Sequence, residues 1–144
     1  MENTITIPSG LEGFTNTNTK KAPTVTDRMI LIIDGKIRER EDDRVCPKCG
    51  CKMHVHDTYD VHLSHIPFGR TLSAVRFEKR RYICPECHAT SMQGVPFQAG
   101  GHRITAPLYS YARDLLELGL TNKNVSELTG LCKNTVKDID KERL

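Results

Sequence analysis

Four cysteines in two Cys-x-x-Cys pairs are the residues of this sequence best suited to chemistry. The pairs are Cys46-Pro-Lys-Cys49 and Cys84-Pro-Glu-Cys87, and residues 50–83 separate them. Each pair can place two thiolates on one metal ion, and four thiolates complete the tetrahedral shell of a structural zinc site. We therefore expect structural Zn2+ at Cys46, Cys49, Cys84 and Cys87, with no open position for catalysis.

Other uses of these side chains are weaker alternatives. A redox Cys-x-x-Cys normally opens a helix in a βαβ context, which is missing here. Cys84-Pro-Glu-Cys87-His88 matches the haem-attachment pattern, but that use requires export and leaves the first pair unexplained. Cys51 could replace Cys49 as a ligand, and whether Cys51 or a histidine does so stays open. A histidine cluster could bind a second metal, although polar strand residues facing water are the simpler interpretation; its members are His54, His56, His62 and His65.

Composition limits the class of protein. The chain has 144 residues, 38% of them hydrophobic, no Trp and six Cys. No segment approaches the ~20 apolar residues of a membrane span, and the N-terminus lacks the pattern of a signal peptide. Unexported cysteines indicate a reducing compartment, so we expect the cytoplasm. The net charge is +3, and the basic residues concentrate between residues 45 and 103 around Lys79-Arg80-Arg81, which fits a polyanion partner and equally a solvated strand.

Three segments follow from the pattern along the chain. Residues 1–27 are rich in Thr, Asn, Pro and Gly and predict a flexible tail. Residues 28–103 predict a β-hairpin and a zinc ribbon. The hairpin is expected at Asp34-Gly35, between two strand-like runs. Alternating residues near 61–65 and 72–77 predict ribbon strands, with a break at Pro67-Phe68-Gly69.

From residue 104 to residue 144 the hydrophobic period changes to that of helices. Thr105 is a suitable cap for a first helix that stops at Gly119, and a second helix runs from Thr121 to Gly130. A third helix starts near Lys133. The residues expected to face inward are Leu108, Tyr111, Ala112, Leu115, Leu118, Val125, Leu128, Val136 and Ile139.

Helix, short helix, a turn with Gly and a further helix form the helix-turn-helix pattern. The predicted fold class is therefore a small α+β chain of two modules, a β-rich zinc ribbon followed by a three-helix helix-turn-helix domain. The outer face of the third helix would meet base edges and phosphates in a major groove. The candidates there are Lys133, Asn134, Thr135 and Lys137. Backbone contacts are expected from Arg76, Lys79, Arg80, Arg81 and Arg103.

At these residues the chain resembles a known family. The quoted stretches are Cys46-Pro-Lys-Cys49-Gly50, Ile66-Pro67-Phe68-Gly69-Arg70, Arg80-Arg81-Tyr82-Ile83-Cys84-Pro85-Glu86-Cys87, Arg103-Ile104-Thr105 and Asn134-Thr135-Val136. They are similar to the N-terminal region of bacterial insertion-sequence transposases of the ISL-three type. The resemblance implies recognition of the terminal inverted repeats of a transposon. It also implies a bacterial cytoplasmic protein that is nucleoid-associated when bound.

In that family a catalytic domain with an acidic DDE triad holds divalent metal ions and follows the DNA-binding region. No such pattern occurs in these 144 residues, so we expect no enzyme activity from them. Whether the chain is an excised piece or a short natural product of a truncated element stays open. Cys132, where the family commonly has a hydroxyl residue, leaves the cap of the third helix in doubt.

The predicted function is sequence-specific binding of double-stranded DNA as the DNA-binding part of a transposase. One alternative is a stand-alone transcriptional regulator or repressor, which would form dimers on a palindromic site. A further alternative is a zinc-stabilised protein-interaction module, whose binding would ignore salt. The expected partner is duplex DNA, with a homodimer as an open alternative, no membrane and no small-molecule substrate.

Overall fold

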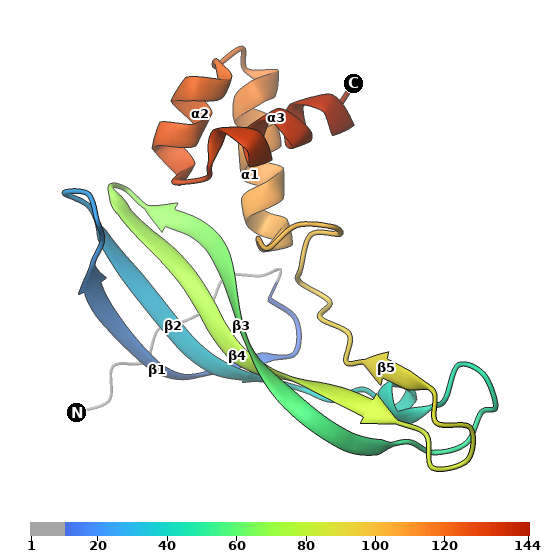
Figure 1. Cartoon of the computed structure of the whole chain (residues 1–144). Coiled ribbons are helices and arrows are strands. Elements are labelled where there is room, and N and C mark those ends of the chain that lie inside the picture. The colour runs from blue at the N-terminus through green and yellow to red at the C-terminus, as the bar shows by residue number, and fades with distance from the viewer. Residues whose placement is uncertain (1–10) are drawn as a thin grey trace.

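A computed structural model describes residues 11–144 (Figure 1). Five strands come first, and three short helices end the chain. The elements are β1 (Phe14–Pro23), β2 (Met29–Ile37), a 3-10 turn η1 (Glu41–Arg44), β3 (His54–Phe68), β4 (Thr71–Ile83), β5 (Thr90–Met92), α1 (Ala106–Glu117), α2 (Asn122–Thr129) and α3 (Lys133–Glu142).

The five strands form one mixed sheet in the order β1-β2-β4-β3, with β5 on the end of β4. Neighbouring pairs are antiparallel except β2 and β4, which pair in parallel from Ile30–Leu72 to Asp34–Arg76. β5 pairs with the last residues of β4, Arg81–Ile83. Figure 1 shows the three helices at the end of the sheet where β3 turns into β4, and β5 at the other end.

The hairpin predicted at Asp34-Gly35 is wrong, because residues 29–37 form the single strand β2. Gly35 serves close packing instead of a turn: a Cβ there would lie 2.5 Å from the Thr15 carbonyl oxygen. The antiparallel partner of β2 is β1, which lies within the segment predicted to be a flexible tail. Residues 1–10 of that segment lie outside the described residues.

The predicted fold class is also wrong. The chain is β-rich, and the ribbon strands β3 and β4 belong to the same five-stranded mixed sheet as β1 and β2. The sequence pattern indicated which residues of a strand are buried. It did not indicate that β2 pairs in parallel with β4, because that contact joins segments about 40 residues apart through backbone groups common to all residues. The strands expected near 61–65 and 72–77 are present, and β3 turns into β4 just after Phe68.

One face of the sheet carries a buried apolar core, here called the core face. Its buried residues include Leu63 and Val75, which pair directly, and Ile33 beside Val75. The rings of Phe14, Phe77 and Phe97 pack edge to face with centroids 5.5–6.3 Å apart.

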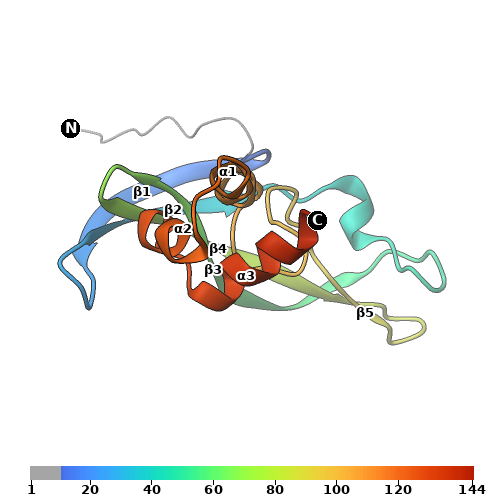
Figure 2. The same cartoon turned by 90° about the horizontal axis from the view of Figure 1, so that it is seen from above.

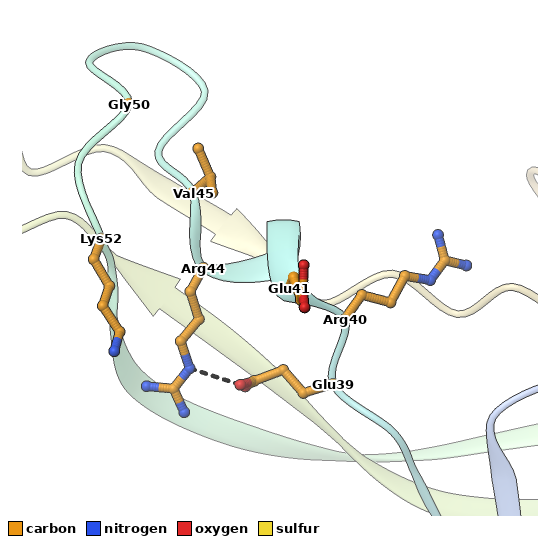
Figure 3. Close-up of a pocket in the computed structure, with 7 residues that line it drawn as sticks. All are labelled: Glu39, Arg40, Glu41, Arg44, Val45, Gly50 and Lys52. Carbon is orange, nitrogen blue, oxygen red and sulfur yellow. Dashed lines mark hydrogen bonds and ion pairs between the residues drawn. The ribbon is translucent and has the colours of Figure 1, made fainter.

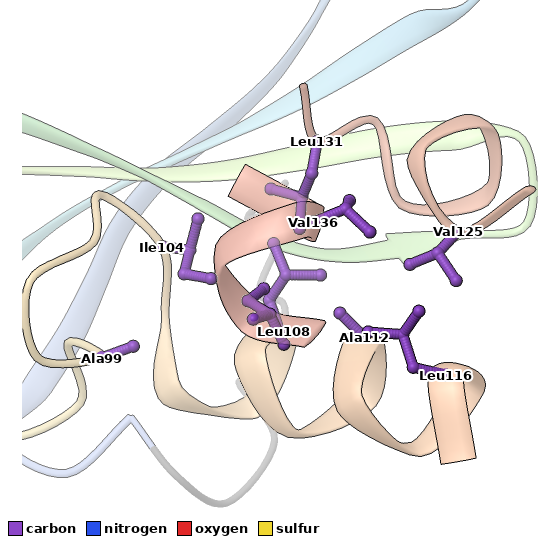
Figure 4. Packing of buried hydrophobic residues seen from close by; sticks show 9 residues of the cluster. Ala99, Ile104, Leu108, Ala112, Leu116, Val125, Leu131 and Val136 are labelled. Atoms are coloured by element: carbon purple, nitrogen blue, oxygen red, sulfur yellow. The ribbon is translucent and has the colours of Figure 1, made fainter. Parts of the chain in front are cut away.

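A second core joins the three helices (Figure 4). The predicted cap of α1 is confirmed, because the Thr105 hydroxyl accepts a hydrogen bond from the Leu108 N–H at 3.3 Å. Two predicted inward residues point to solvent instead: Leu118 is 77% exposed and Leu128 47% exposed. Thr129 is buried in the position that was expected for Leu128. The Thr129 hydroxyl donates a hydrogen bond to the Val125 carbonyl at 2.7 Å, so this buried polar group has a partner. The other residues of this core are Ala99, Ile104, Leu108, Ala112, Leu116, Leu131, Val136 and Ile139.

Specific contacts fix the helices to the end of the sheet. Ser64 of β3 forms a parallel bridge with Ile104, just before α1. Arg28, which follows the β1–β2 turn, donates to the Glu127 carbonyl of α2 and to the Arg70 carbonyl at the β3–β4 turn. The sheet therefore contacts the helices at two places, just before α1 and near the end of α2. Among residues 11–144, none of the helices combines the length and apolar character needed to cross a bilayer.

Candidate metal centre and basic side chains

The first cysteine pair lies in a tight knuckle between η1 and β3. The Cys46 N–H donates to the Cys51 carbonyl at 2.9 Å, and the Gly50 N–H donates to the Cys46 carbonyl at 2.9 Å. Gly50 adopts φ +76°, a backbone conformation that glycine reaches without steric cost. Val45 and Lys52 pair across the base of the knuckle and close it.

The second pair repeats this geometry between β4 and β5. The Cys84 N–H donates to the Ala89 carbonyl at 2.9 Å, and the His88 N–H donates to the Cys84 carbonyl at 3.0 Å. His88 occupies the position of Gly50 and adopts φ +63°. The two knuckles thus have one backbone design, although only one has glycine at the left-handed position.

The two knuckles bring their four thiols together. The Cys46 and Cys87 sulfurs lie 3.4 Å apart, as do those of Cys49 and Cys84. All four ligand atoms lie within 4.8 Å of one another. A tetrahedral zinc with bonds of about 2.3 Å needs sulfurs about 3.8 Å apart, so these spacings fit it. The predicted structural Zn2+ site is confirmed, because four cysteine sulfurs at this spacing suit that ion.

Local electrostatics favour thiolates at the first cysteine of each pair. The Cys49 N–H donates to Cys46 and lowers the pKa of that thiol to about 6. The Cys87 N–H lowers the pKa of Cys84 in the same way. At Cys49 the Cys51 N–H also favours the thiolate, but the neighbouring Cys84 thiolate and burial outweigh it and raise the pKa. Four adjacent sulfurs cannot all ionise without a cation, and a bound dication removes that repulsion.

A polar network beside the first knuckle was not foreseen from the sequence. Glu39 accepts hydrogen bonds from Arg44 at 2.8 Å, Arg80 at 3.1 Å and the Tyr82 hydroxyl at 2.7 Å. Burial and the hydrogen bond to Glu39 raise the pKa of Tyr82 to about 12. Burial alone would raise the pKa of Glu39, but the Arg44 and Tyr82 bonds outweigh it and lower the pKa. Tyr82 is fully buried with Met53, Cys46 and Cys84, so the network anchors the apolar support of the metal site.

A hollow of about 770 Å³ adjoins this network (Figure 3). Its walls carry both acidic and basic side chains, and two of these, Glu39 and Arg44, form an ion pair. Because the charges on its walls largely offset each other, the hollow has no strong preference for an anion or a cation. The lining residues are Glu39, Arg40, Glu41, Arg44, Val45, Gly50 and Lys52.

The alternative metal ligands lie outside the four-thiol group. Cys51 is half-buried against the Met53 and Tyr82 cluster and is not part of the four-thiol group. Within residues 11–144, no second group of three His, Cys, Asp or Glu side chains is close enough to hold a metal. His54, His56 and His62 are exposed on β3 as expected. His65 is buried, so the expectation that it faces water is wrong.

The arginines of the predicted basic strand are mostly held by carboxylates. Arg76 pairs with Asp34 at 2.5 Å, Arg80 with Glu39 at 3.1 Å, and Arg81 makes two bonds to Asp57 at 2.9 and 2.7 Å. Residues of a strand alternate between faces, so Arg76 and Arg80 lie on one face and Lys79 and Arg81 on the other. The basic strand therefore does not present one continuous positive surface.

The remaining predicted contact residues differ in accessibility. Lys79 and Arg103 have no carboxylate within ion-pair distance in the described part of the chain. On α3, Lys133, Asn134 and Lys137 are exposed. Thr135 is half-buried, and its hydroxyl lies 3.1 Å from the Cys132 sulfur. Cys132 occupies the cap position of α3 but makes no side-chain cap bond.

Comparison with known proteins identifies the segment around the metal site. Residues 42–87 match the family model described as the zinc-finger of transposase IS204/IS1001/IS1096/IS1165. These residues hold both knuckles and the strands between them. The segment that holds the metal centre is therefore similar to the zinc ribbon of these transposases. No curated protein and no solved structure matches the chain. A zinc ribbon of this kind supports a role in binding zinc or DNA, and α1–α3 lie outside the matched residues.

Proposed function

We propose that this chain binds double-stranded DNA in a sequence-specific way, as the DNA-binding part of a bacterial transposase that recognises terminal inverted repeats. The observation that carries the proposal is the match of residues 42–87 to a transposase zinc finger, with its four thiols gathered for zinc. The zinc has a structural role here, since four thiolates leave no position for water or substrate. Binding without catalysis is therefore what we assign to these residues.

The arrangement of α2 and α3 supports a helix-turn-helix. Gly130 ends α2 with φ +78°, and the buried side chains of Val125, Leu131 and Val136 fix the crossing of the two helices. This packing leaves Lys133 and Asn134, with Lys137 one turn later, on the outer surface of α3. An α-helix with its side chains is about 10–12 Å across, which fits a major groove about 12 Å wide. The ten residues of α3 would extend about 15 Å along that groove.

The sheet adds contacts beside the recognition helix. Among the backbone-contacting residues predicted in the sheet region, Lys79 and Arg103 are the two that no carboxylate of the described residues holds, and we assign phosphate contacts to them first. Arg76, Arg80 and Arg81 would contact phosphates only at the expense of their ion pairs, so we assign them chiefly to the sheet. The proposal places the protein in the bacterial cytoplasm, on the nucleoid when bound.

The deciding experiment is selection of bound duplexes from a random library at two ionic strengths. Sequence-specific binding predicts a preferred site and an affinity that falls with salt, with a log–log slope near −0.9 per neutralised phosphate. Binding that ignores salt would favour the protein-interaction alternative.

Single substitutions on α3 then test how the site is read. Asn134→Ala should cost about 1–3 kcal/mol on the preferred site and little on unrelated duplexes, if Asn134 reads a base edge. Lys133→Ala should weaken binding to all DNA sequences to a similar extent. Lys123→Ala, on the exposed surface of α2, is the matched control. A uniform loss for Asn134→Ala would assign that residue to the backbone instead.

A further inference from the structure

An open groove of about 370 Å³ lies between β3 and the segment that leads from β5 to α1. Figure 1 shows this segment rising from β5 alongside β3 toward the helices. Its walls include Tyr59 of β3, Lys79 of β4, Met92 of β5, and Gln98 and Arg103 of the connecting segment. The groove is distinct from the metal centre and from the outer surface of α3, and its size falls within the range of small-ligand sites.

The charge of the groove is positive. Lys79 and Arg103 both line it, and they are the two predicted phosphate-contacting residues of the sheet region that no carboxylate in residues 11–144 pairs with. One carboxylate, that of Asp60, is among the lining groups. Two unpaired cations against one anion favour a negatively charged ligand.

An aromatic side chain lies beside these cations. Tyr59 pairs with Lys79 across the β3–β4 ladder, and Tyr59 keeps 37% of its surface exposed. The Arg81 guanidinium lies over the Tyr59 ring at 5.5 Å from its centroid, and Asp57 fixes that guanidinium through two hydrogen bonds. The ring is thus held in place from one side while part of it faces the groove.

We propose that this groove binds an unpaired nucleotide of DNA, with its base against Tyr59 and its phosphate between Lys79 and Arg103. The inference rests on the proposed function. Proteins that bind single-stranded nucleic acid combine aromatic rings with basic side chains, because bases stack on the rings and phosphates pair with the cations. Bases stacked inside a duplex do not present a face to such a ring, so the groove selects an unstacked nucleotide.

The groove is also well placed next to the proposed recognition helix. His102, adjacent to Arg103, lies 3.1 Å from a Glu142 carboxylate oxygen near the end of α3, and the Tyr109 hydroxyl donates to the other oxygen at 2.8 Å. Figure 2 shows the end of α3 beside this segment. An unpaired extension of a duplex bound along α3 therefore has the groove within its reach.

Fluorescence anisotropy with four DNA probes tests the inference. The probes are a blunt duplex with the selected site, the same duplex with a thymidine extension on either strand, and a free thymidine oligonucleotide. The full chain loaded with zinc should bind one extended duplex more tightly than the blunt one. Tyr59→Ala should weaken binding of the extended and free probes about fivefold or more and leave the blunt duplex unchanged. Tyr59→Phe should retain wild-type binding, because it keeps the ring.

The cations are tested through salt dependence. Lys79→Ala and Arg103→Ala should each reduce the log–log salt slope for the free oligonucleotide by about 0.7. Lys20→Ala, an exposed lysine on β1, is the control and should leave that slope unchanged. Zinc content and the thermal transition establish that each variant is folded.

The outcomes separate this inference from the proposed function. Equal binding of blunt and extended duplexes, with no binding of the free oligonucleotide, overturns the groove and leaves duplex recognition standing. Equal losses for Tyr59→Phe and Tyr59→Ala, or competition by a polyglutamate peptide as strong as by the oligonucleotide, also overturn it. Failure to bind the blunt duplex, with the free oligonucleotide still bound through Tyr59, overturns the proposed function and supports the groove.

Discussion

His65 Nδ1 lies 2.8 Å from the hydroxyl oxygen of Thr105, and both residues are buried. The same oxygen accepts the Leu108 N–H as the cap of α1. One hydrogen-bonded hydroxyl therefore joins β3 of the sheet to the first turn of the helices. The other ring nitrogen, Nε2, is buried without a partner among the described residues, so any charge on this ring would be poorly solvated.

This contact predicts a pH dependence of stability. Burial lowers the pKa of His65 below its usual value of about 6.5. The unfolded chain then binds a proton in a pH range where the folded chain does not. The stabilisation is complete above about pH 6.5 and is lost as the pH falls from there toward the lowered pKa, by at most about 1.4 kcal/mol per pH unit.

Urea unfolding at pH 7.5 and 5.5, with zinc in excess, measures this effect. The His65→Gln variant should lose less stability on acidification than the wild type. His56→Gln is the control, because His56 is exposed on the same strand, and it should follow the wild type. Parallel pH profiles for the wild type and His65→Gln would contradict the prediction.

The two knuckles predict opposite effects of substitutions at equivalent positions. Gly50 has φ +76°, and no atom lies within 4 Å of the place that a Cβ would take, so Gly50→Ala adds backbone strain alone. We expect Gly50→Ala to reduce the free energy of unfolding by about 1 kcal/mol. His88→Gly relieves the same strain at φ +63°, offset by the greater freedom of glycine in the unfolded chain, and should be neutral or stabilising.

Thermal unfolding of the zinc-loaded variants compares these two changes, and a chelator titration gives their zinc affinities. Destabilisation by His88→Gly as large as that by Gly50→Ala would mean that the His88 side chain has a role beyond the backbone geometry.

The metal centre predicts that residues 45–103 depend on zinc for their fold. Cys84→Ser removes one buried thiolate, and because zinc binding here contributes to folding, the ribbon should lose both its metal and its cooperative transition. Cys51→Ser is the matched control, since Cys51 lies outside the four-thiol group, and it should keep one zinc per chain. Elemental analysis and circular dichroism are the measurements. A Cys84→Ser protein that lacked metal and still melted cooperatively at the wild-type temperature would contradict the structural role.

The metal site was predictable from sequence because its chemistry is local. The spacing within Cys46–Cys49 and Cys84–Cys87 places two thiols per knuckle, and few other uses fit two such pairs. Helix limits were predictable for the same reason: Thr105 and Gly130 act on residues within one turn of themselves.

The sheet and the charge network depend on distant contacts that no local pattern encodes. The Asp34-Gly35 dipeptide has the composition of a turn, yet Gly35 packs under Phe14 and Thr15 of β1 in a continuous strand. The basic residues Arg76 and Arg81 look free in sequence, and their partners Asp34 and Asp57 lie on other strands. A side chain's availability for DNA therefore depended on tertiary structure.

The contact between the α2–α3 turn and the sheet gives a final prediction. A Cβ at Gly130 would lie 2.6 Å from a Leu72 methyl carbon, and Gly130 also has φ +78°. Gly130→Ala should therefore destabilise the chain through backbone strain, about 1 kcal/mol, and through the clash with Leu72. Leu72→Ala removes the clashing methyl groups, so the double variant should lose less than the two single losses combined.

A double-mutant cycle by chemical unfolding measures this coupling, which should be about 0.5 kcal/mol or more for residues in contact. Gly119→Ala is the control: it has a positive φ in a helix–helix turn but open space where its Cβ would lie, and its loss should add independently to that of Leu72→Ala. Additive losses for Gly130→Ala and Leu72→Ala would mean that the turn does not pack on the sheet in solution. In that case the Tyr59 groove and α3 would no longer be held at a fixed separation, and an extension on the duplex would gain affinity only through a flexible connection.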